Sequence, residues 1–441
     1  MSIFSGFKKK GRNRAVVVGL DGVPYTMINN LRSKKRIQNI NKIVSDGYFG
    51  QMEVCIPEIS SVSWSSFMTG TQSGNHGIYG FIDLEPSSYN MFFPNFRNLK
   101  APTLWDEIAI EEKKSVIINM PSTYPARKID GALISGFVAV DLEKAVFPQS
   151  VLPKLKEIGY RIDIDTMKGR QDHEFLIRDL EATLEIRRKA FDYFWDQVDW
   201  DLFIFVITGT DRIMHFLWNA YEDESHPYHK EFLDYYDRVD EVVGHIYHRY
   251  LELEGSQNAN NQFIMLSDHG FTGIKTEVFI NKWLQEHNYL KFSNDNPKTI
   301  MDIGEGTVAF AMDPSRIYIN LKGKYPKGKV QKEDIGKICD ELTDGLAGIT
   351  YTNDQKIVKK IFRKDELYYG PHIGDAPEIV LLSNYGFDLK GRVNVDGVFG
   401  MSGLVGMHTQ DDAFFYHSGA KECRTIFDVK NVIQKSLVSR S

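Results

Sequence analysis

The stretch Pro57–Phe81, PEISSVSWSSFMTGTQSGNHGIYGF, decides how the rest of the chain is interpreted. Pro57 ends a strand-like run, and an apolar face at helical spacing then extends from Trp64 to Met68. Three hydroxyl side chains near the start of this helix could cap it, those of Ser60, Ser61 and Ser63. The pattern predicts a helix that begins close to Ser60.

A helix that begins here directs free N–H groups and a partial positive charge at whatever lies before it. A seryl oxygen beside those groups suits a phosphate or another oxyanion. An ordinary capped helix would show the same pattern. The stretch can therefore be interpreted as part of a catalytic site only together with the Asp and His residues that follow strands elsewhere in the chain.

Composition limits the classes of protein that remain. The chain has 441 residues, 42% of them hydrophobic, so it can bury a large core. Its net charge of −6 argues against specific nucleic-acid binding. Cys55, Cys339 and Cys423 are far apart, which fits a reducing compartment and excludes a cysteine-built zinc site. No apolar run has membrane-spanning length and no signal peptide is evident, so we expect a cytoplasmic protein.

The chain is predicted to form one large domain. Residues 1–14 are a basic tail, expected to be solvated or to touch an anionic membrane surface weakly, and its charges are Lys8, Lys9, Lys10, Arg12 and Arg14. Residues 15–435 lack repeats and flexible linkers, which favours a single catalytic domain. Segments around 79–100 and 291–400 are expected to be insertions that form a cap or lid beside the site.

Several short apolar runs have the pattern of strands buried on both faces. They are Ala15–Leu20, Ser115–Met120, Asp201–Ile207 and Asn261–Leu266, and Asp412–Tyr416 is a further predicted strand. The basic segment Leu31–Gly47 is predicted to be one helix, and Gly400–His408 a loop. Ligands of open α/β sheets gather at the carboxyl ends of the strands, so polar residues at those ends are candidates for a site.

Asp21 follows the first predicted strand, although a lone Asp-Gly can simply begin a turn. Asp211 and His215 follow another strand at a spacing of four, which places both on one helical face. A surface pair would have the same spacing.

Asp268 and His269 end a strand before Gly270, as a compact metal-binding corner or a capped turn would. His408 stands alone in a predicted loop, where a histidine normally has no special role. Together with the preceding residues they make three carboxylates and three imidazoles. That set suits two metal ions completed by a seryl oxygen, most simply zinc, or manganese if carboxylates dominate.

The order of these segments resembles the alkaline phosphatase superfamily, in particular its type I phosphodiesterase/nucleotide pyrophosphatase branch. The resemblance is carried by VVVGLDG, by the pattern from Pro57 to Ile78, and by TGTDRIMH, LSDHGF and GMH. It implies that Asp21, Asp268 and His269 hold one metal ion, which also contacts the nucleophile. It implies that Asp211, His215 and His408 hold the other.

The nucleophile of this family lies nine residues before the Thr of a Thr-Gly pair, which here selects Ser60 before Thr69. Most pyrophosphatase relatives have Thr at that position. Ser61 stands where many relatives have Pro, so it remains the alternative nucleophile. Phe81 stands where the pyrophosphatase type has a phosphate-binding Asn, which leaves the choice between monoesters and diesters open.

The resemblance implies an α/β fold with three α/β/α layers and a mostly parallel central sheet. It implies hydrolysis of phosphodiester or pyrophosphate bonds, or of phosphomonoesters, in a small or nucleotide-like substrate. In this scheme a serine activated by one of two divalent ions attacks phosphorus, and a phosphoseryl intermediate is then hydrolysed.

Three alternatives have different weight. A sulfatase of the same superfamily is disfavoured because Ser60-Ser61-Val62-Ser63-Trp64 lacks the Pro and Arg that its modified residue requires. A phosphotransferase or mutase differs only in the acceptor of the phosphoryl group. A non-catalytic binding protein that keeps the fold is disfavoured, because all six candidate ligands are present. The oligomeric state does not follow from the sequence.

Overall fold

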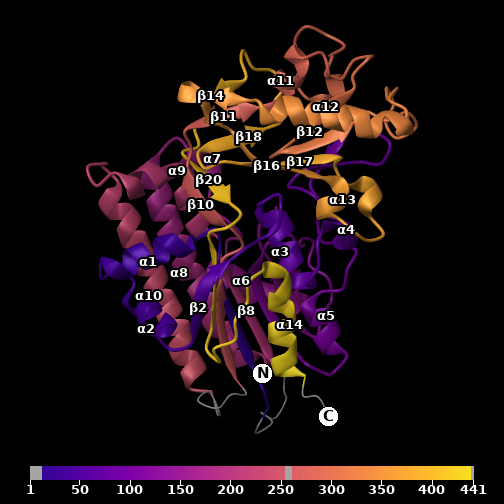
Figure 1. Ribbon diagram of the computed structural model, residues 1–441. Helices are drawn as coiled ribbons and strands as arrows, with labels where there is room; N and C mark the ends of the chain where they lie inside the picture. Colours follow the sequence, from indigo (N-terminus) through magenta and orange to yellow (C-terminus); the bar gives the residue numbers. More distant parts are fainter. Residues whose placement is uncertain (1–11, 254–260, 439–441) are drawn as a thin grey trace.

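The computed structural model describes residues 12–253 and 261–438 (Figure 1). An eight-stranded sheet forms its centre, in the order β2-β21-β9-β1-β8-β5-β6-β7. The strands are β2 Tyr48–Met52, β21 Ala413–His417, β9 Gln262–Leu266, β1 Ala15–Leu20, β8 Leu202–Ile207, β5 Ser115–Met120, β6 Gly131–Ser135 and β7 Val146–Phe147. The five strands from β9 to β6 are parallel, and β2, β21 and β7 pair antiparallel at the edges.

Helices cover both faces of this sheet, as alternation along β1 requires. Val16 and Val18 face a core formed with α1 Tyr25–Ser33, α2 Gln38–Val44, α6 Leu152–Ile158, α8 His173–Gln197, α9 Gly209–Glu222 and α10 His229–Leu251. Ala15 and Val17 face a second core with α3 Ser60–Thr69, α5 Leu104–Ala109 and α14 Ile426–Leu437. The three-layer α/β/α architecture expected from the sequence is confirmed.

Two local expectations were wrong. The basic segment Leu31–Gly47 contains two helices, α1 and α2, because Lys35 and Ile37 adopt positive φ angles of 56° and 32° and break the helical path. His408 does not lie in a loop. It belongs to β20 Gly406–Thr409, which pairs antiparallel with β10 Gly270–Gly273 and places His408 opposite Phe271.

Helix α3 begins at Ser60, as predicted, but the expected serine cap is absent. Ile59 occupies the N-cap position with extended backbone, and no serine side chain caps the helix. The helix ends at Gly70, whose φ of 66° is the left-handed conformation that glycine favours. The three serines are therefore not needed as caps of this helix.

Two of the five basic residues in the expected solvated tail, Arg12 and Arg14, form ion pairs in the structure. Lys8, Lys9 and Lys10 lie outside the described residues. Arg12 pairs with Asp199 at 2.5 Å and with Asp201 at 3.3 Å, and Arg14 pairs with Asp199 at 3.3 Å. These two arginines are anchored to the segment that leads into β8, so both belong to the folded part of the chain.

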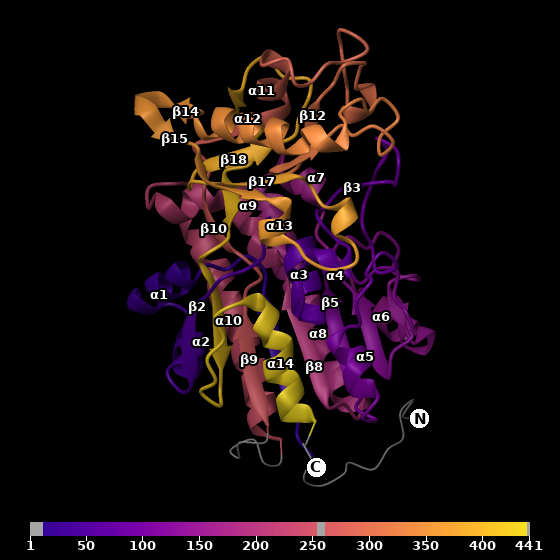
Figure 2. The ribbon, with the colours of Figure 1, turned by 45° about the vertical axis from the view of Figure 1, so that its right-hand side comes forward.

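A smaller lobe lies above the carboxyl ends of the central strands, coloured mostly orange in Figures 1 and 2. One sheet has the order β12-β13-β17-β16 and another the order β18-β11-β19. The lobe is built from β11 Thr276–Phe279, α11 Ile280–Glu286, β12 Ala309–Met312, β13 Arg316–Ile319, α12 Ile335–Ala347, β14 Thr350–Tyr351, β15 Gln355–Lys356, β16 Val358–Arg363, α13 Lys364–Leu367, β17 Ile379–Ser383, β18 Phe387–Lys390 and β19 Phe399–Gly400. It has a hydrophobic core of its own.

The two segments expected to be insertions contact each other. Residues 79–100 include only the short strands β3 Asp83–Leu84 and β4 Met91–Phe92. Asp83 pairs with buried Arg316 of the lobe, and Tyr89 donates a hydrogen bond to Asn320 at 2.8 Å. The segment 79–100 thus packs with the lobe, which begins at β11 and so somewhat earlier than residue 291.

Two further short helices are α4 Ser73–His76, which follows α3, and α7 Thr166–Gly169, which precedes α8. Within residues 12–253 and 261–438, no helix is long and apolar enough to cross a membrane. Cys55, Cys339 and Cys423 are buried free thiols.

Candidate active site

Neighbouring parallel strands deliver the candidate residues to one edge of the sheet. Asp21 directly follows β1, Asp211 and His215 lie on α9 after β8, and Asp268 and His269 follow β9. Because β9, β1 and β8 are adjacent and parallel, their carboxyl ends meet at one place. His408 on β20 and Ser60 at the start of α3 complete the group, so the structure brings together all seven residues selected from the sequence.

Asp211, His215 and His408 form one tight cluster. Asp211 Oδ1 lies 3.2 Å from Nε2 of His215 and 3.2 Å from Nε2 of His408. The two Nε2 atoms are 3.0 Å apart. Ligands about 2.0–2.1 Å from a tetrahedral zinc ion are separated by roughly 3.3 Å, so these three atoms have the spacing of a metal's ligands.

Asp21, Asp268, His269 and Ser60 form a second cluster. Nε2 of His269 lies 3.6 Å from Asp21 Oδ1 and 3.5 Å from Asp268 Oδ2. Ser60 Oγ lies 3.1 Å from the same nitrogen and 3.4 Å from Asp21 Oδ1. The serine oxygen is thus part of this cluster, at the N-terminus of α3.

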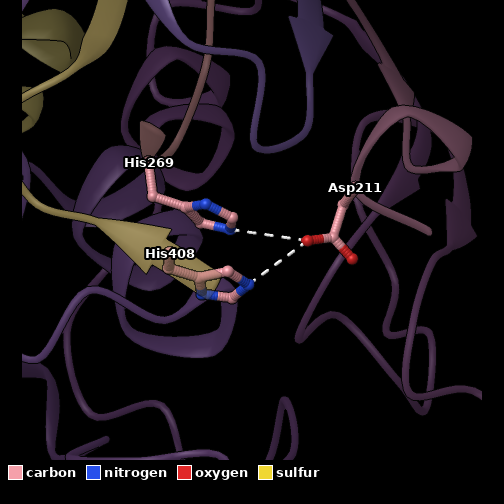
Figure 3. Close-up of side chains that lie close together, drawn as sticks. All are labelled: Asp211, His269 and His408. Atoms are coloured by element: carbon pink, nitrogen blue, oxygen red, sulfur yellow. Dashed lines mark ion pairs between the residues drawn. The ribbon is translucent and has the colours of Figure 1, made fainter. Parts of the chain in front are cut away.

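The two clusters adjoin, because His269 of the second cluster also faces Asp211 of the first, and Figure 3 shows the rings of His269 and His408 both directed toward Asp211. Nε2 of His269 is 4.0 Å from Asp211 Oδ1, and the His269 ring stacks on that of His408 at 3.6 Å between centroids. Asp211, His269 and His408 therefore could also hold an ion together. His215 lies nearer to Asp211 than His269 does, so the geometry favours His215 as the third member of that cluster.

The backbone orients all three imidazoles. Nδ1 of His215 lies 2.9 Å from Gly406 O, Nδ1 of His408 lies 2.8 Å from Glu58 O, and Nδ1 of His269 lies 3.0 Å from Gly270 O. A carbonyl oxygen only accepts, so each Nδ1 carries a proton and donates it. A neutral imidazole then has a lone pair on Nε2, and all three Nε2 atoms point into the site, as in metal-binding histidines.

Unpartnered oxygens support a cation in each cluster. Asp211 Oδ1 and Asp268 Oδ2 are buried and accept no hydrogen bond from the described residues. Leaving such an oxygen without a partner costs about 1–3 kcal/mol or more for a charged group. The donor set and these oxygens fit divalent metal ions, one in each cluster.

The pKa values of the buried carboxyl and imidazole groups also favour bound cations. Burial raises the pKa of Asp21 well above its usual value, and the neighbouring Asp268 and Asp211 raise it further. Burial raises the pKa of Asp268 to about 7 and lowers that of His408 to about 3. Carboxylates in a buried space repel one another, and positive charge beside Asp21 and Asp268 would restore the ionised state of these two.

The other two serines of the stretch have different surroundings. Ser63 is fully buried and its Oγ lies 2.9 Å from the sulfur of Cys55. Ser61 Oγ is buried and has no hydrogen-bond partner among the described residues. Of the three serines, Ser60 is the one whose oxygen lies beside His269 and Asp21.

Two functional candidates were missed in the sequence. Arg212 donates to Asp211 Oδ2 at 2.9 Å and to Asp163 Oδ2 at 2.8 Å, so it holds the oxygen of Asp211 that faces away from the imidazoles. Trp64 Nε1 donates to Asp21 Oδ2 at 3.3 Å. The Asp-Arg pair inside TGTDRIMH was the one available signal for Arg212, because a charged residue rarely follows a buried strand so closely without a partner.

Phe81 lies in an aromatic stack near the site. Its ring is parallel to that of Phe137 at 5.4 Å and edge-on to that of Phe93 at 5.2 Å. Arg212 lies over the other ring of this stack, 4.2 Å from the centroid of Phe137. A phenyl ring cannot donate the hydrogen bond of an asparagine.

Comparison with known proteins decides the family. The profile described as type I phosphodiesterase/nucleotide pyrophosphatase matches residues 15–411. The chain belongs to this family. It is therefore an enzyme of the alkaline phosphatase superfamily that hydrolyses phosphate esters, as expected from the sequence. Among curated protein sequences, none matches the chain significantly.

Solved structures show the same fold at low identity. Phosphonoacetate hydrolase from Sinorhizobium meliloti, in complex with phosphonoacetate, is 14% identical with a TM-score of 0.61, covering 97% of this chain and 96% of that one. An inactive variant of murine ectonucleotide pyrophosphatase/phosphodiesterase 5 in complex with AMP is 14% identical with a TM-score of 0.58, covering 97% and 95%. These two similarities extend over the central sheet and the lobe together.

Proposed function

We propose that this phosphate-ester hydrolase works with two divalent metal ions and a covalent phosphoseryl intermediate on Ser60. The observation that carries the proposal is the position of Ser60 Oγ, 3.1 Å from His269 Nε2 and 3.4 Å from Asp21 Oδ1 at a helix N-terminus. A nucleophile belongs where anions are stabilised and where ligands for a cation converge.

Asp21, Asp268 and His269 would hold one ion next to Ser60, and Asp211, His215 and His408 would hold the other. Three imidazoles among carboxylates suit zinc, with manganese as the second choice. When bound, two such ions supply Lewis acidity and neutralise charge that develops on the phosphoryl oxygens. Elemental analysis of the purified protein tests this assignment, with about two ions per chain expected.

The chain's own groups perform the remaining work. Ser60 Oγ forms a bond to phosphorus as the bond from phosphorus to the leaving oxygen breaks, and the proton of the serine hydroxyl ends on the leaving oxygen. A water oxygen then replaces Ser60 Oγ on phosphorus, and one proton of that water returns to the serine. The first-turn N–H groups of α3 direct partial positive charge at the phosphoryl group throughout.

We further propose that residues 15–435 act as one catalytic domain whose lobe serves as a lid. Support comes from a small cavity between the two parts, lined by His215 and His408 together with Pro314 and Leu389 of the lobe. The buried free thiols suit work in a reducing compartment such as the cytoplasm.

The substrate would be a small phosphodiester, pyrophosphate or monoester. Hydrolysis of bis(4-nitrophenyl) phosphate and of 4-nitrophenyl phosphate by zinc-loaded and manganese-loaded protein separates these classes. Activity on neither compound with either metal, in folded protein that has taken up two ions, would contradict the proposed function.

A further inference from the structure

The cavity beside the proposed metal site has an unusual charge balance. Its volume is about 90 Å³. The catalytic side contributes Glu58, His215 and His408, and the lobe contributes Ser315, Asp388 and Lys390. Because two proposed metal ligands line it, a group that enters the cavity lies next to the reacting phosphorus.

Glu58 is the acid of this cavity that forms no ion pair with a described residue. Lys390 pairs with Asp388 at 2.7 Å, and Lys359, on the other side of Glu58, pairs with Asp411 at 2.8 Å. Each lysine is therefore already paired with an aspartate. Oε2 of Glu58 is buried and accepts no hydrogen bond from any residue in the described part of the chain.

From this arrangement we propose that the cavity binds a short ammonium-bearing group of the substrate, with the Glu58 carboxylate as its counter-ion. The inference rests on the proposed function and narrows its substrate class to phosphate esters or phosphonates that carry an amine. The backbone carbonyl of Glu58 accepts a hydrogen bond from His408, which ties the main chain at Glu58 to one of the proposed metal ligands.

Three observations favour an organic ammonium over other occupants. Among the described residues, the ligand atoms that converge enough to hold an ion belong to the two clusters of the active site, and Glu58 is a member of neither. A second phosphate would meet the carboxylates of Glu58 and Asp388. The cavity of about 90 Å³ has room for several water molecules, each of which needs about 10–15 Å³ on this measure, and so for a group the size of an aminoethyl chain.

Binding can be measured without turnover. Zinc-loaded Ser60→Ala protein is titrated in a calorimeter with 2-aminoethylphosphonate and with propylphosphonate, which differ in one terminal ammonium. The amine is expected to bind at least about tenfold more tightly, as a partly desolvated charge pair would require. Adding Glu58→Gln, which keeps the shape of the side chain, should bring the ratio of the two affinities close to one.

Glu53→Gln is the matched control, because Glu53 is exposed and lies outside this cavity. It should keep the preference for the amine. Equal affinity for the two phosphonates, binding of neither, or a preference that survives Glu58→Gln would overturn the inference. In each of those cases, the proposed function would still hold if the enzyme with Ser60 intact hydrolysed bis(4-nitrophenyl) phosphate. If the protein instead bound the amine selectively but hydrolysed no ester, the proposed function alone would be overturned.

Discussion

His408 Nε2 lies 3.2 Å from Asp211 Oδ1, and neither atom has a proton to share. The single proton of neutral His408 is donated from Nδ1 to the carbonyl of Glu58, and Asp211 Oδ1 accepts no hydrogen bond from the described residues. Two electron-rich atoms at this distance repel each other unless a positive charge lies between them. The relationship is the strongest geometric reason to expect an ion here.

Asp211→Ala or His408→Ala should each remove one metal ion and lower kcat by orders of magnitude while the fold is kept. Asp211 lies on α9 and His408 on β20, and both are outside the two hydrophobic cores of the sheet, so truncation creates no cavity in a core. Elemental analysis and circular dichroism of the purified variants check this. His245→Ala is the control, because His245 pairs with Asp192 between α8 and α10 at 2.6 Å. A variant of Asp211 that keeps both ions would remove it from the ligand set.

Arg212→Met should weaken the second metal ion and lower kcat/KM by roughly 10–100-fold, as loss of a residue that orients a metal ligand does. Arg212 bridges Asp211 and Asp163, so its loss also leaves a buried carboxylate oxygen without a donor. Arg212→Lys should restore part of the metal affinity because it keeps the charge but not the paired geometry. Metal titration with a competing chelator measures the effect, and an unchanged dissociation constant would contradict the role.

Stability should fall in acid through buried His76. Burial lowers the pKa of this imidazole from 6.5 to about 3, so between these values the unfolded chain binds one more proton than the folded chain. The free energy of unfolding therefore rises with pH in this window and is lost as pH falls, by up to about 1.4 kcal/mol per pH unit for this group. Urea unfolding of metal-free protein at pH 5 and pH 7 measures the slope. His76→Asn should flatten it, and an unchanged slope would exclude His76 as the cause.

Arg12→Ala should destabilise the fold without changing kcat. Arg12 pairs with Asp199 and donates to the carbonyl of Trp200 at 2.7 Å, near the amino ends of the strands and away from the site. Loss of charge-assisted hydrogen bonds of this kind costs about 2 kcal/mol. Chemical denaturation and steady-state kinetics on one preparation check both parts. A chain that begins at Arg14 should therefore be less stable than one that begins at Gly11.

Much of the fold and site could be predicted because the signals are local. A parallel strand covered on both faces is typically a continuous apolar run, and β1 and β8 are such runs. Polar residues placed directly after them, such as Asp21 and Asp211, then share one edge of the sheet. The candidate site thus follows from strand order and the identity of the next residues.

The remaining features depend on contacts between distant segments. Nothing in GMHT marks a strand, because β20 exists only through its pairing with β10. Glu58 shares a cavity with Asp388 and Lys390, which follow more than 300 residues later in the sequence. Arg12 pairs with Asp199, a residue far away in the sequence that lies just before β8. Such relationships are set by tertiary packing and leave no periodic trace in the sequence.

Substitution of the serines separates the nucleophile from its neighbours. Ser60→Ala should abolish turnover while the metal content stays close to that of the parent, and Ser60→Thr should keep substantial activity because the same oxygen is retained. Ser61→Ala and Ser63→Ala should have mild effects on kcat. Ser63→Ala should cost about 1 kcal/mol of stability through its lost contact with Cys55.

The most direct test of the account is to trap the covalent intermediate. The metal-loaded enzyme is mixed with a phosphate ester whose phosphoryl-enzyme is hydrolysed slowly, quenched in acid, digested and examined by peptide mass spectrometry. The account predicts one phosphoryl group on Ser60 in the peptide that contains ISSVSW. A phosphoryl group on Ser61, or an active Ser60→Ala enzyme that forms no covalent adduct, would contradict it.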